Sequence, residues 1–310
     1  MIIYGTFASG LQKPIEKWLK EDGHKVRVVL DGAIIYEVKS GKSSALPCFF
    51  NTFSVINQTR GSIEDLMRKT LRRPNVKKGR GSFRLVTSKE NQLTSVDNRL
   101  RNEMEKAIAS QSGLIPDRRG GKGVREFWFL SRSEGIVLFM ERIQMSGKSE
   151  RIVKLKKGEL RPQLAYCLNR LGSPQPSDIM LDPFCGHEAI PRSRAKHFPC
   201  KEILFYDKMH QNRGHRADIV QLPTMFPENS IDVIVTDPPW GVYKEEDVSA
   251  LYESFAKVCG YLLKPDGRLV VLSAQKELMH MLFPVNTCYN ILVSGQKAAI
   301  FVINLMRSEK

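Results

Sequence analysis

Residues 233–241 read Val-Ile-Val-Thr-Asp-Pro-Pro-Trp-Gly and, more than any other stretch, determine the fold class that we expect of this chain. The run of branched apolar residues before the aspartate is typical of a buried β-strand. The two prolines after it stiffen the turn. Asp237, the Pro238 carbonyl and the Trp240 ring should therefore converge on one spot, which suits an amine on a planar base. The candidate catalytic residues are Asp237, Pro238, Pro239 and Trp240.

A second strand-to-loop junction lies 55 residues earlier in the chain, at Asp182. Residues 179–186 read Ile-Met-Leu-Asp-Pro-Phe-Cys-Gly, a short strand that runs into an acidic residue, a turn and a glycine. Glycine at such a junction lets the backbone approach a ligand closely, and the amino terminus of the next helix can receive a carboxylate. This junction predicts a ligand at the carboxyl end of the strand.

The rest of the carboxyl-terminal half alternates strand-like and helix-like segments. We expect strands at 179–181, 203–206, 231–236 and 267–273, a helix at 248–262, and an antiparallel pair at 290–293 and 298–305. Such alternation predicts an α/β, Rossmann-like doubly wound sheet, in which ligands bind at the carboxyl ends of the strands.

The amino-terminal half has a different pattern. A strand at 1–7, a helix at 11–19 and strands at 26–30 and 33–38 around the turn Asp31-Gly32 predict a small α+β, ferredoxin-like unit. Further along, we expect a helix at 98–110 capped by Asp97 and strands at 126–131 and 135–141. The polar, basic segment 148–157 is typical of a linker between domains.

The charge of the chain favours a polyanionic partner. Its 310 residues include 48 Lys and Arg against 33 Asp and Glu, which leaves a formal charge of +15. Each phosphate contact made by such a protein releases a counterion. A basic enzyme that binds no nucleic acid is the alternative, because net charge does not define function.

Basic residues concentrate in two stretches. Nine lie between Arg68 and Lys89 without an acidic residue, and the prolines and glycines of that stretch predict a loop within it. Residues 118–125 form a second basic loop. The alternative to nucleic-acid contact is a solvated linker. The candidate RNA-binding residues are Arg68, Arg72, Arg73, Lys77, Lys78, Arg80, Arg118 and Arg119.

Several other classes of protein are disfavoured. The longest apolar runs, such as 298–305, are too short to span a bilayer, and the first residues lack the pattern of a signal peptide. Six scattered cysteines without a C-x-x-C pair indicate reduced thiols, so we expect a cytoplasmic protein without a membrane partner. Cys185 and His187 with His197 and Cys200 have ligand-like spacing, but Cys185 belongs to the ligand loop, so we expect no metal.

Two of these motifs resemble those of a known class of enzyme. Residues 182–186 and 236–241 look like the first and fourth motifs of amino methyltransferases. The whole chain resembles the THUMP-domain RNA methyltransferases that make N2-methylguanosine in tRNA. This resemblance implies a ferredoxin-like domain at 1–60, a basic THUMP-like RNA-binding region at 61–147, a linker at 148–157 and a Rossmann-like methyltransferase domain at 158–310.

The resemblance also implies a cofactor and a reaction. S-adenosylmethionine would donate a methyl group to the exocyclic amine of guanine in an RNA, with tRNA as the implied partner. Asp207 falls where the family binds the ribose hydroxyls, and Asp218 where it contacts the adenine amine. The candidate cofactor-binding residues are Asp182, Pro183, Phe184, Cys185, Gly186, Glu188, Asp207, Asp218 and Asp237.

One residue departs from the family pattern. The family continues Cys-Gly-Ser-Gly-Thr, whereas this chain has Cys-Gly-His-Glu-Ala, so that Glu188 replaces the second glycine. The Glu188 carboxylate would either repel the carboxylate of the cofactor or bind its ammonium group. The sequence leaves both outcomes open.

Two other functions remain as alternatives. The first is an N6-adenine or N4-cytosine nucleic-acid methyltransferase, because such enzymes share the Asp-Pro-Pro-Trp motif. The second is a non-catalytic RNA-binding protein with a degenerate methyltransferase domain, which Glu188 favours and the intact motif at Asp237 disfavours. The need for a protein partner or activator also stays open.

Overall fold

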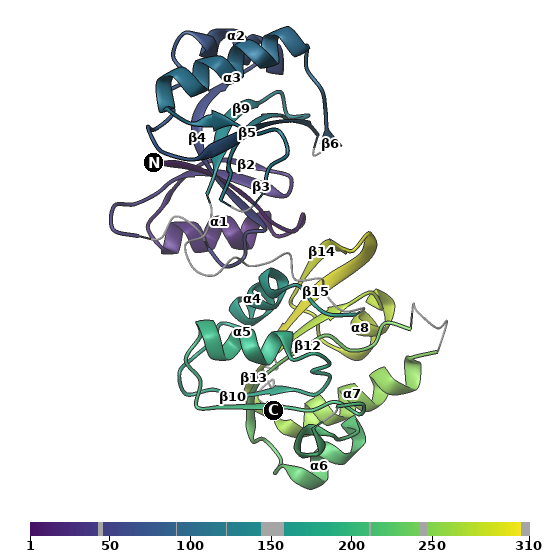
Figure 1. Ribbon diagram of the computed structural model, residues 1–310. Helices are drawn as coiled ribbons and strands as arrows, with labels where there is room; N and C mark the ends of the chain where they lie inside the picture. Colours follow the sequence, from purple (N-terminus) through teal and green to yellow (C-terminus); the bar gives the residue numbers. More distant parts are fainter. Residues whose placement is uncertain are drawn as a thin grey trace. The chain divides into compact units, whose positions relative to one another are not determined.

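The computed structural model describes residues 1–42, 46–90, 92–121, 123–143, 158–210, 212–241 and 247–304 (Figure 1). The chain forms two units. One holds Met1–Thr6 and Ile15–Ser149, and the other holds Phe7–Pro14 and Glu150–Lys310. The predicted linker 148–157 lies outside the described residues.

The amino-terminal unit is built on one sheet that runs through both of its predicted parts. Its order within the described residues is β2-β3-β1-β4-β9-β8-β5-β6, with β7 beside β5. The strands are β1 (Ile2–Thr6), β2 (Lys25–Leu30), β3 (Ala33–Glu37), β4 (Asn51–Thr59), β5 (Ser82–Lys89), β6 (Gln92–Leu93), β7 (Ile115–Pro116), β8 (Arg125–Ser131) and β9 (Val137–Arg142). The helices are α1 (Gln12–Glu21), α2 (Ile63–Leu71) and α3 (Asn98–Ser112).

Local sequence signals account for much of this unit. The predicted hairpin at Asp31-Gly32 is confirmed, because β2 and β3 pair antiparallel from Leu30 and Ala33 outward. Asp97 caps α3 as predicted, since its side chain accepts a hydrogen bond from the Leu100 N–H at 3.0 Å. Helices α2 and α3 cover one face of the sheet, where they bury an apolar core against β5, β8 and β9 (Figure 1).

The predicted boundary at residue 60 falls between β4 and α2 and does not interrupt the sheet. Strand β4 pairs antiparallel with β9, so the segment 51–59 is hydrogen-bonded to the segment 137–142. The division of this unit into a ferredoxin-like and a THUMP-like part stays a prediction.

The carboxyl-terminal unit has the predicted α/β architecture. Its sheet order within the described residues is β11-β10-β12-β13-β15-β14. The strands are β10 (Ile179–Asp182), β11 (Glu202–Phe205), β12 (Ile231–Thr236), β13 (Leu263–Ser273), β14 (Thr287–Val293) and β15 (Gln296–Asn304). The helices are α4 (Pro162–Leu171), α5 (Ala189–His197), α6 (Leu222–Met225), α7 (Ser249–Leu262) and α8 (Lys276–Leu282), with 3-10 turns at η1 (Arg213–His215) and η2 (Ile219–Gln221).

This sheet is doubly wound. Strands β11, β10, β12 and β13 are parallel, and β15 and β14 close the sheet as the predicted antiparallel pair. Figure 1 shows α4 and α5 on one face and α6 and α7 on the other. The main core of the unit lies between the strands and α7, α8 and η2. Fold class and most strand positions were therefore predictable from periodicity alone.

The order of the strands reverses the direction of winding between β10 and β12. The chain passes from β10 to β11 on one side and then returns to β12 on the other, so the winding direction reverses at β10. Ligands of open α/β sheets bind at such a reversal, outside the carboxyl ends of the strands. Both motifs singled out in the sequence lie at this point, because Asp182 ends β10 and Asp237 follows the last residue of β12.

Among the helices of the described residues, none has the length and apolar character that crossing a membrane requires.

Candidate active site at the ends of β10 and β12

A buried hydrogen bond joins the two strand ends. The Thr236 hydroxyl donates to Asp182 Oδ1 at 2.7 Å, and the Phe184 N–H donates to the same oxygen at 3.2 Å. Asp182 is almost wholly buried, and its second oxygen bonds no atom among the described residues. Burial raises the pKa of Asp182 to about 7, against the lowering effect of these two bonds. The first loop and the Asp-Pro-Pro-Trp turn therefore form one site.

The Asp-Pro-Pro-Trp turn is held by the side chain of its own tryptophan. The Trp240 indole N–H donates to Asp237 Oδ1 at 2.9 Å and lies 3.3 Å from the Leu272 carbonyl. Burial raises the pKa of Asp237 to about 7, and the bond from Trp240 opposes this rise. Asp237 and Trp240 are half-buried, Pro238 is buried and Pro239 is exposed. Only the faces and one edge of the Trp240 ring remain for a substrate, because its N–H is engaged within the turn.

Three residues that the sequence analysis did not single out support this turn. Gln275 donates from Nε2 to the Trp240 carbonyl at 2.5 Å, and its own backbone N–H donates to Ser273 Oγ at 2.9 Å. The Tyr252 hydroxyl lies 2.6 Å from the same Ser273 oxygen. Ser273 and Gln275 could have been found, because they stand at the carboxyl end of the predicted strand 267–273. Tyr252 carries no such signal.

The loop after β10 contacts the loop after β11. The Gly186 N–H donates to Asp207 Oδ2 at 3.1 Å, and the Met209 N–H donates to Asp207 Oδ1 at 2.8 Å. Gly186 has a left-handed φ of +47°, and a Cβ there would meet no atom of the described chain within 4 Å. A ligand can therefore approach this backbone closely. Each Asp207 oxygen keeps a lone pair, so the carboxylate can still accept hydroxyl hydrogens.

The side chains of the first loop mostly face the protein. Pro183 and Cys185 are buried, and burial raises the pKa of the Cys185 thiol. The Phe184 ring packs edge-on against Phe255, with 5.6 Å between the ring centroids. These three residues shape the loop, and the backbone N–H groups of Phe184 and Cys185 are bonded to Asp182 and to the Tyr206 carbonyl.

The remaining two candidate cofactor residues already have protein partners. Glu188 Oε1 lies 3.0 Å from His210 Nε2, a contact that no sequence signal indicated. Asp218 caps η2 and forms an ion pair with Lys208 Nζ at 2.9 Å. That ion pair and the local hydrogen bonds lower the pKa of Asp218. Asp218 thus lies beside the Asp207 loop, because Lys208 directly follows Asp207.

The candidate RNA-binding residues fall into two groups. Arg68, Arg72, Arg73, Lys77, Lys78, Arg80 and Arg119 are exposed along the end of α2, the segment after it and the 118–125 loop. Arg118 differs, because its guanidinium forms an ion pair with Glu105 at 2.8 Å and also contacts Asn102. That pairing raises the pKa of Arg118 and neutralises part of its charge.

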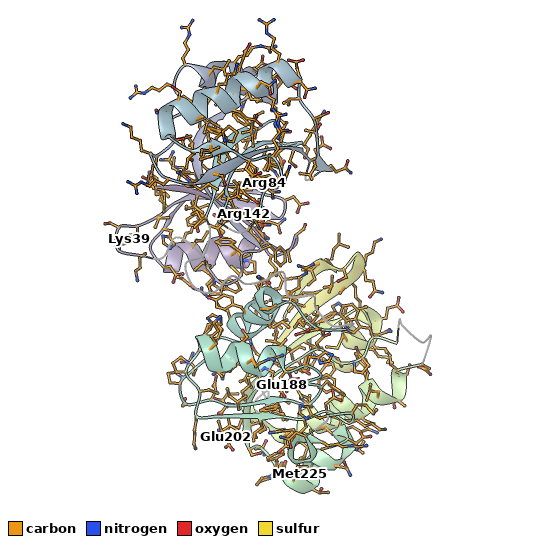
Figure 2. All side chains as sticks on the ribbon, viewed as in Figure 1. Lys39, Arg84, Arg142, Glu188, Glu202 and Met225 are labelled. Carbon is orange, nitrogen blue, oxygen red and sulfur yellow. The ribbon has the colours of Figure 1, made fainter. Side chains whose placement is uncertain are left out.

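Other arginines of the amino-terminal unit are neutralised across its sheet. Glu126 pairs with Arg84 at 2.5 Å and with Arg142 at 3.1 Å. Figure 2 labels the two arginines. Arg125 pairs with Glu141 at 2.7 Å. The uncompensated positive charge therefore concentrates on the segment that follows α2.

The cysteines and histidines with ligand-like spacing have other contacts. The Cys200 thiol donates to the Asp178 carbonyl, and the His197 ring packs edge-on against Tyr166. Among the residues that the structure describes, no three His, Cys, Asp or Glu side chains form a group that could hold a metal ion.

Comparison with known proteins matches much of this unit to a family of methyltransferases. Residues 150–195 and 207–289 match the UPF0020 family model, described as an RMKL-like methyltransferase domain. The carboxyl-terminal unit is similar to an RMKL-like methyltransferase domain. The matched ranges contain Asp182, Glu188, Asp218 and Asp237, so both predicted motifs lie within the part of the chain that is similar to this family.

Two curated relatives cover this domain and its surroundings. The chain is 30% identical over 147 residues to a tRNA (guanine(6)-N2)-methyltransferase of Thermus thermophilus, which is 41% of this chain and 43% of the relative. It is 27% identical over 183 residues to the tRNA (guanine(6)-N(2))-methyltransferase THUMP3 of Bos taurus, 46% of this chain and 36% of the relative. The matches thus span less than half the length of either relative.

The fold similarity extends beyond the methyltransferase domain. The crystal structure of TrmN from Thermus thermophilus superposes with a TM-score of 0.78 at 20% identity and covers 98% of this chain and 99% of TrmN. Both halves of the chain therefore share their fold with TrmN. The predicted resemblance and the α/β, Rossmann-like fold of the carboxyl-terminal unit are confirmed, whereas the THUMP-like region stays a prediction.

The residues of the methyltransferase domain fit S-adenosylmethionine. Asp207 can bind two vicinal hydroxyls, and the turn at Gly186 leaves space beside its backbone. The carboxyl groups of the site suit a ligand that carries a positive sulfonium and a positive ammonium group. Asp182 Oδ2 is buried and has no partner among the described residues, so it can accept a hydrogen bond from a ligand.

Proposed function

We propose that this chain is an S-adenosylmethionine-dependent methyltransferase that methylates the N2 amine of guanine in tRNA. The observation that carries the proposal is the hydrogen bond between Thr236 and Asp182, which joins the amine-binding motif to the loop that fits the cofactor. The two tRNA guanine-N2-methyltransferases that the chain matches support the same base and the same class of RNA.

The cofactor would supply an electrophilic methyl group on its sulfonium. Its sugar would be held by Asp207 and its amino-acid part by the loop from Asp182 to Glu188. Positioning of two reactants supplies much of the rate enhancement in such a bimolecular transfer. The hydrogen bond from Thr236 to Asp182 would hold the cofactor-binding loop and the Asp237 turn at a fixed distance from each other.

Asp237 and the Pro238 carbonyl would bind the amine. The lone pair of an exocyclic amine is delocalised into the base, and hydrogen bonds from its N–H groups to these two acceptors localise it on nitrogen. Asp237 Oδ1 already accepts the Trp240 N–H, so Oδ2 is the oxygen that faces the substrate amine. With its pKa raised to about 7, Asp237 is suited to accept the proton that the amine loses after methylation.

The exposed basic residues of α2 and the segment 72–80 would bind RNA phosphates. Those of the segment 72–80 form no ion pair with an acidic side chain of the described chain, in contrast to Arg84, Arg125 and Arg142, whereas Arg68 on α2 interacts electrostatically with Asp65. Phosphate contacts position an RNA without reading its sequence. The choice of nucleotide would thus depend on how the RNA presents one guanine to Asp237.

Transfer of labelled methyl groups to unmodified tRNA, followed by nucleoside analysis, tests this function. We expect labelled N2-methylguanosine, and we expect Asp237→Ala to lower turnover by at least roughly a hundredfold while RNA affinity and the fold remain. Asp266→Asn, an exposed carboxylate of the same unit, is the matched control.

Other outcomes would contradict the proposal. Labelled N6-methyladenosine or N4-methylcytidine would assign the chain to another class of amino methyltransferase. Absence of label together with absence of cofactor binding would identify a non-catalytic RNA-binding protein. Undiminished turnover of Asp237→Ala would exclude the role given to that residue.

A further inference from the structure

Glu188 stands in a strained backbone conformation at the start of α5. Its φ of +62° and ψ of 25° lie in the left-handed region, which costs a residue with a side chain more than it costs glycine. The Glu188 carbonyl accepts the Arg192 N–H at 3.0 Å, but the Glu188 side chain makes no capping bond to the helix. Helix formation therefore does not explain why this position is a glutamate. The strained backbone conformation indicates that the glutamate side chain has another role.

His210 holds the Glu188 carboxylate in place. His210 Nε2 lies 3.0 Å from Glu188 Oε1, and the histidine side chain is 8% exposed against 35% for the glutamate. His210 Nδ1 lies 3.1 Å from the Asn212 backbone nitrogen and 3.3 Å from the Asn212 carbonyl oxygen, and a proton carried on Nε2 can be donated to Glu188. The ring also packs edge-on against Phe205 and His215. The carboxylate is thus oriented by a fixed donor.

One carboxylate oxygen remains available for a ligand. Among the described residues, none bonds Glu188 Oε2, and the side chain is a third exposed. Glu188 lies two residues after Gly186, whose N–H bonds Asp207 on the neighbouring loop. The open backbone, the Asp207 carboxylate and the Glu188 carboxylate therefore border the same turn.

We propose that Glu188 binds the α-ammonium group of the cofactor's amino-acid part and that His210 is the residue that positions it. A charge-assisted hydrogen bond from an ammonium to a carboxylate is among the stronger polar contacts. A hydrogen bond donated by His210 stabilises the Glu188 carboxylate and fixes its orientation. This inference rests on the proposed use of S-adenosylmethionine, and it makes the ammonium group the feature by which this chain selects its cofactor.

Calorimetric binding of three ligands to the full-length chain tests the assignment. The probes are S-adenosylhomocysteine, its analogue built on 4-mercaptobutyrate, which lacks only the α-amino group, and its decarboxylated analogue, which keeps the amino group. We expect Glu188→Gln to weaken S-adenosylhomocysteine and the decarboxylated analogue by about tenfold and to leave the deaminated analogue unchanged.

Two further variants separate positioning from folding. His210→Ala should weaken the ligands that carry an amino group by a few-fold, whereas His210→Gln, which can keep an N–H donor, should restore most of that loss. Glu202→Gln is the matched control, because this exposed glutamate lies on β11 away from the loop (Figure 2). Its affinities for all three ligands should equal those of the unmodified chain.

Three results would overturn the inference. Equal weakening of all three ligands by Glu188→Gln would mean that the residue only shapes the loop. Tighter binding of S-adenosylhomocysteine by that variant would mean that Glu188 repels the cofactor. Failure of the unmodified chain to bind S-adenosylhomocysteine at all would refute the proposed function itself, and this inference with it.

Discussion

Two aspartates lie at neighbouring strand ends in the candidate site, and burial raises the pKa of both. Asp182 and Asp237 have pKa values raised to about 7, chiefly because the surrounding protein disfavours their charged forms. Perturbed carboxyls of this kind are concentrated in active sites. The sequence placed both residues at strand ends, but their altered pKa values depend on the packing around them.

The raised pKa of Asp237 predicts a stability effect with a definite sign. The neutral form is favoured in the folded chain, so this group's favourable contribution to stability is complete below about pH 4 and is lost as the pH rises through about 7. Asp237→Asn removes the charge. The variant should therefore be more stable than the unmodified chain above pH 7, by up to about 4 kcal/mol for three pKa units.

Urea unfolding of the ligand-free chain between pH 5 and pH 8 checks this prediction. The difference in unfolding free energy between Asp237→Asn and the unmodified chain should increase across this range. Asp266→Asn, which removes an exposed charge, should show a small and constant difference. A difference for Asp237→Asn that falls with rising pH would contradict the assignment.

At the scale of single elements, the β14–β15 hairpin shows how a turn sets strand register. Ser294 and Gly295 connect the strands with φ values of +51° and +84°, and Val293 pairs with Gln296. Two left-handed residues in a two-residue loop define the turn type that prefers Asn-Gly. Glycine meets this need at the second position, whereas serine at the first position is strained.

Substitution of Ser294 should change the stability of this hairpin in two directions. Ser294→Asn should raise the free energy of unfolding by roughly 0.5 kcal/mol, because asparagine tolerates the left-handed region. Ser294→Val should lower it by about 1–2 kcal/mol, because a β-branched residue does not. Urea unfolding of the three chains should rank them Asn, Ser, Val, and equal midpoints would show that the turn relaxes without cost.

At the scale of the whole molecule, net charge overstates the surface available to RNA. Several arginines of the amino-terminal unit form ion pairs with Glu105, Glu126 and Glu141, whereas the basic residues of the segment 72–80 form no ion pair with acidic side chains of the described chain. The position of the uncompensated charge is thus more informative than the total of +15.

Neutralising four of these residues should change the salt dependence of RNA binding. Replacement of Arg72, Arg73, Lys77 and Lys78 by Gln should weaken tRNA binding and lower the slope of log affinity against log salt by up to about 3, at roughly 0.7–0.9 per phosphate contact. Filter binding at salt concentrations between about 50 and 200 mM measures this slope.

A triple variant serves as the control for this experiment. Lys17, Lys20 and Arg27 form ion pairs with Glu21, Glu16 and Glu37, so their replacement by Gln removes charge that is already compensated. Its salt slope should equal that of the unmodified chain. An unchanged slope in the quadruple variant, or an equal drop in both variants, would place the RNA elsewhere on the molecule.

Local patterns predicted the elements better than they predicted the site. The strand 231–236 and the cap at Asp97 match the structure because periodicity and capping act over a few residues. Strand β13 begins at Leu263, four residues earlier than predicted. A register shift between β12 and β13 accommodates these additional residues. The contacts of Gln275 and His210 were missed because each depends on a partner more than twenty residues away.

The sequence by itself determined the α/β class, the two acidic strand ends and the surplus of basic residues, because these follow from side-chain chemistry and short-range periodicity. Only the tertiary structure decided that Thr236 bonds Asp182, that His210 holds Glu188 and that Glu126 neutralises two arginines. Each of these contacts joins segments that are distant in the chain, and strand order and pairing bring them together.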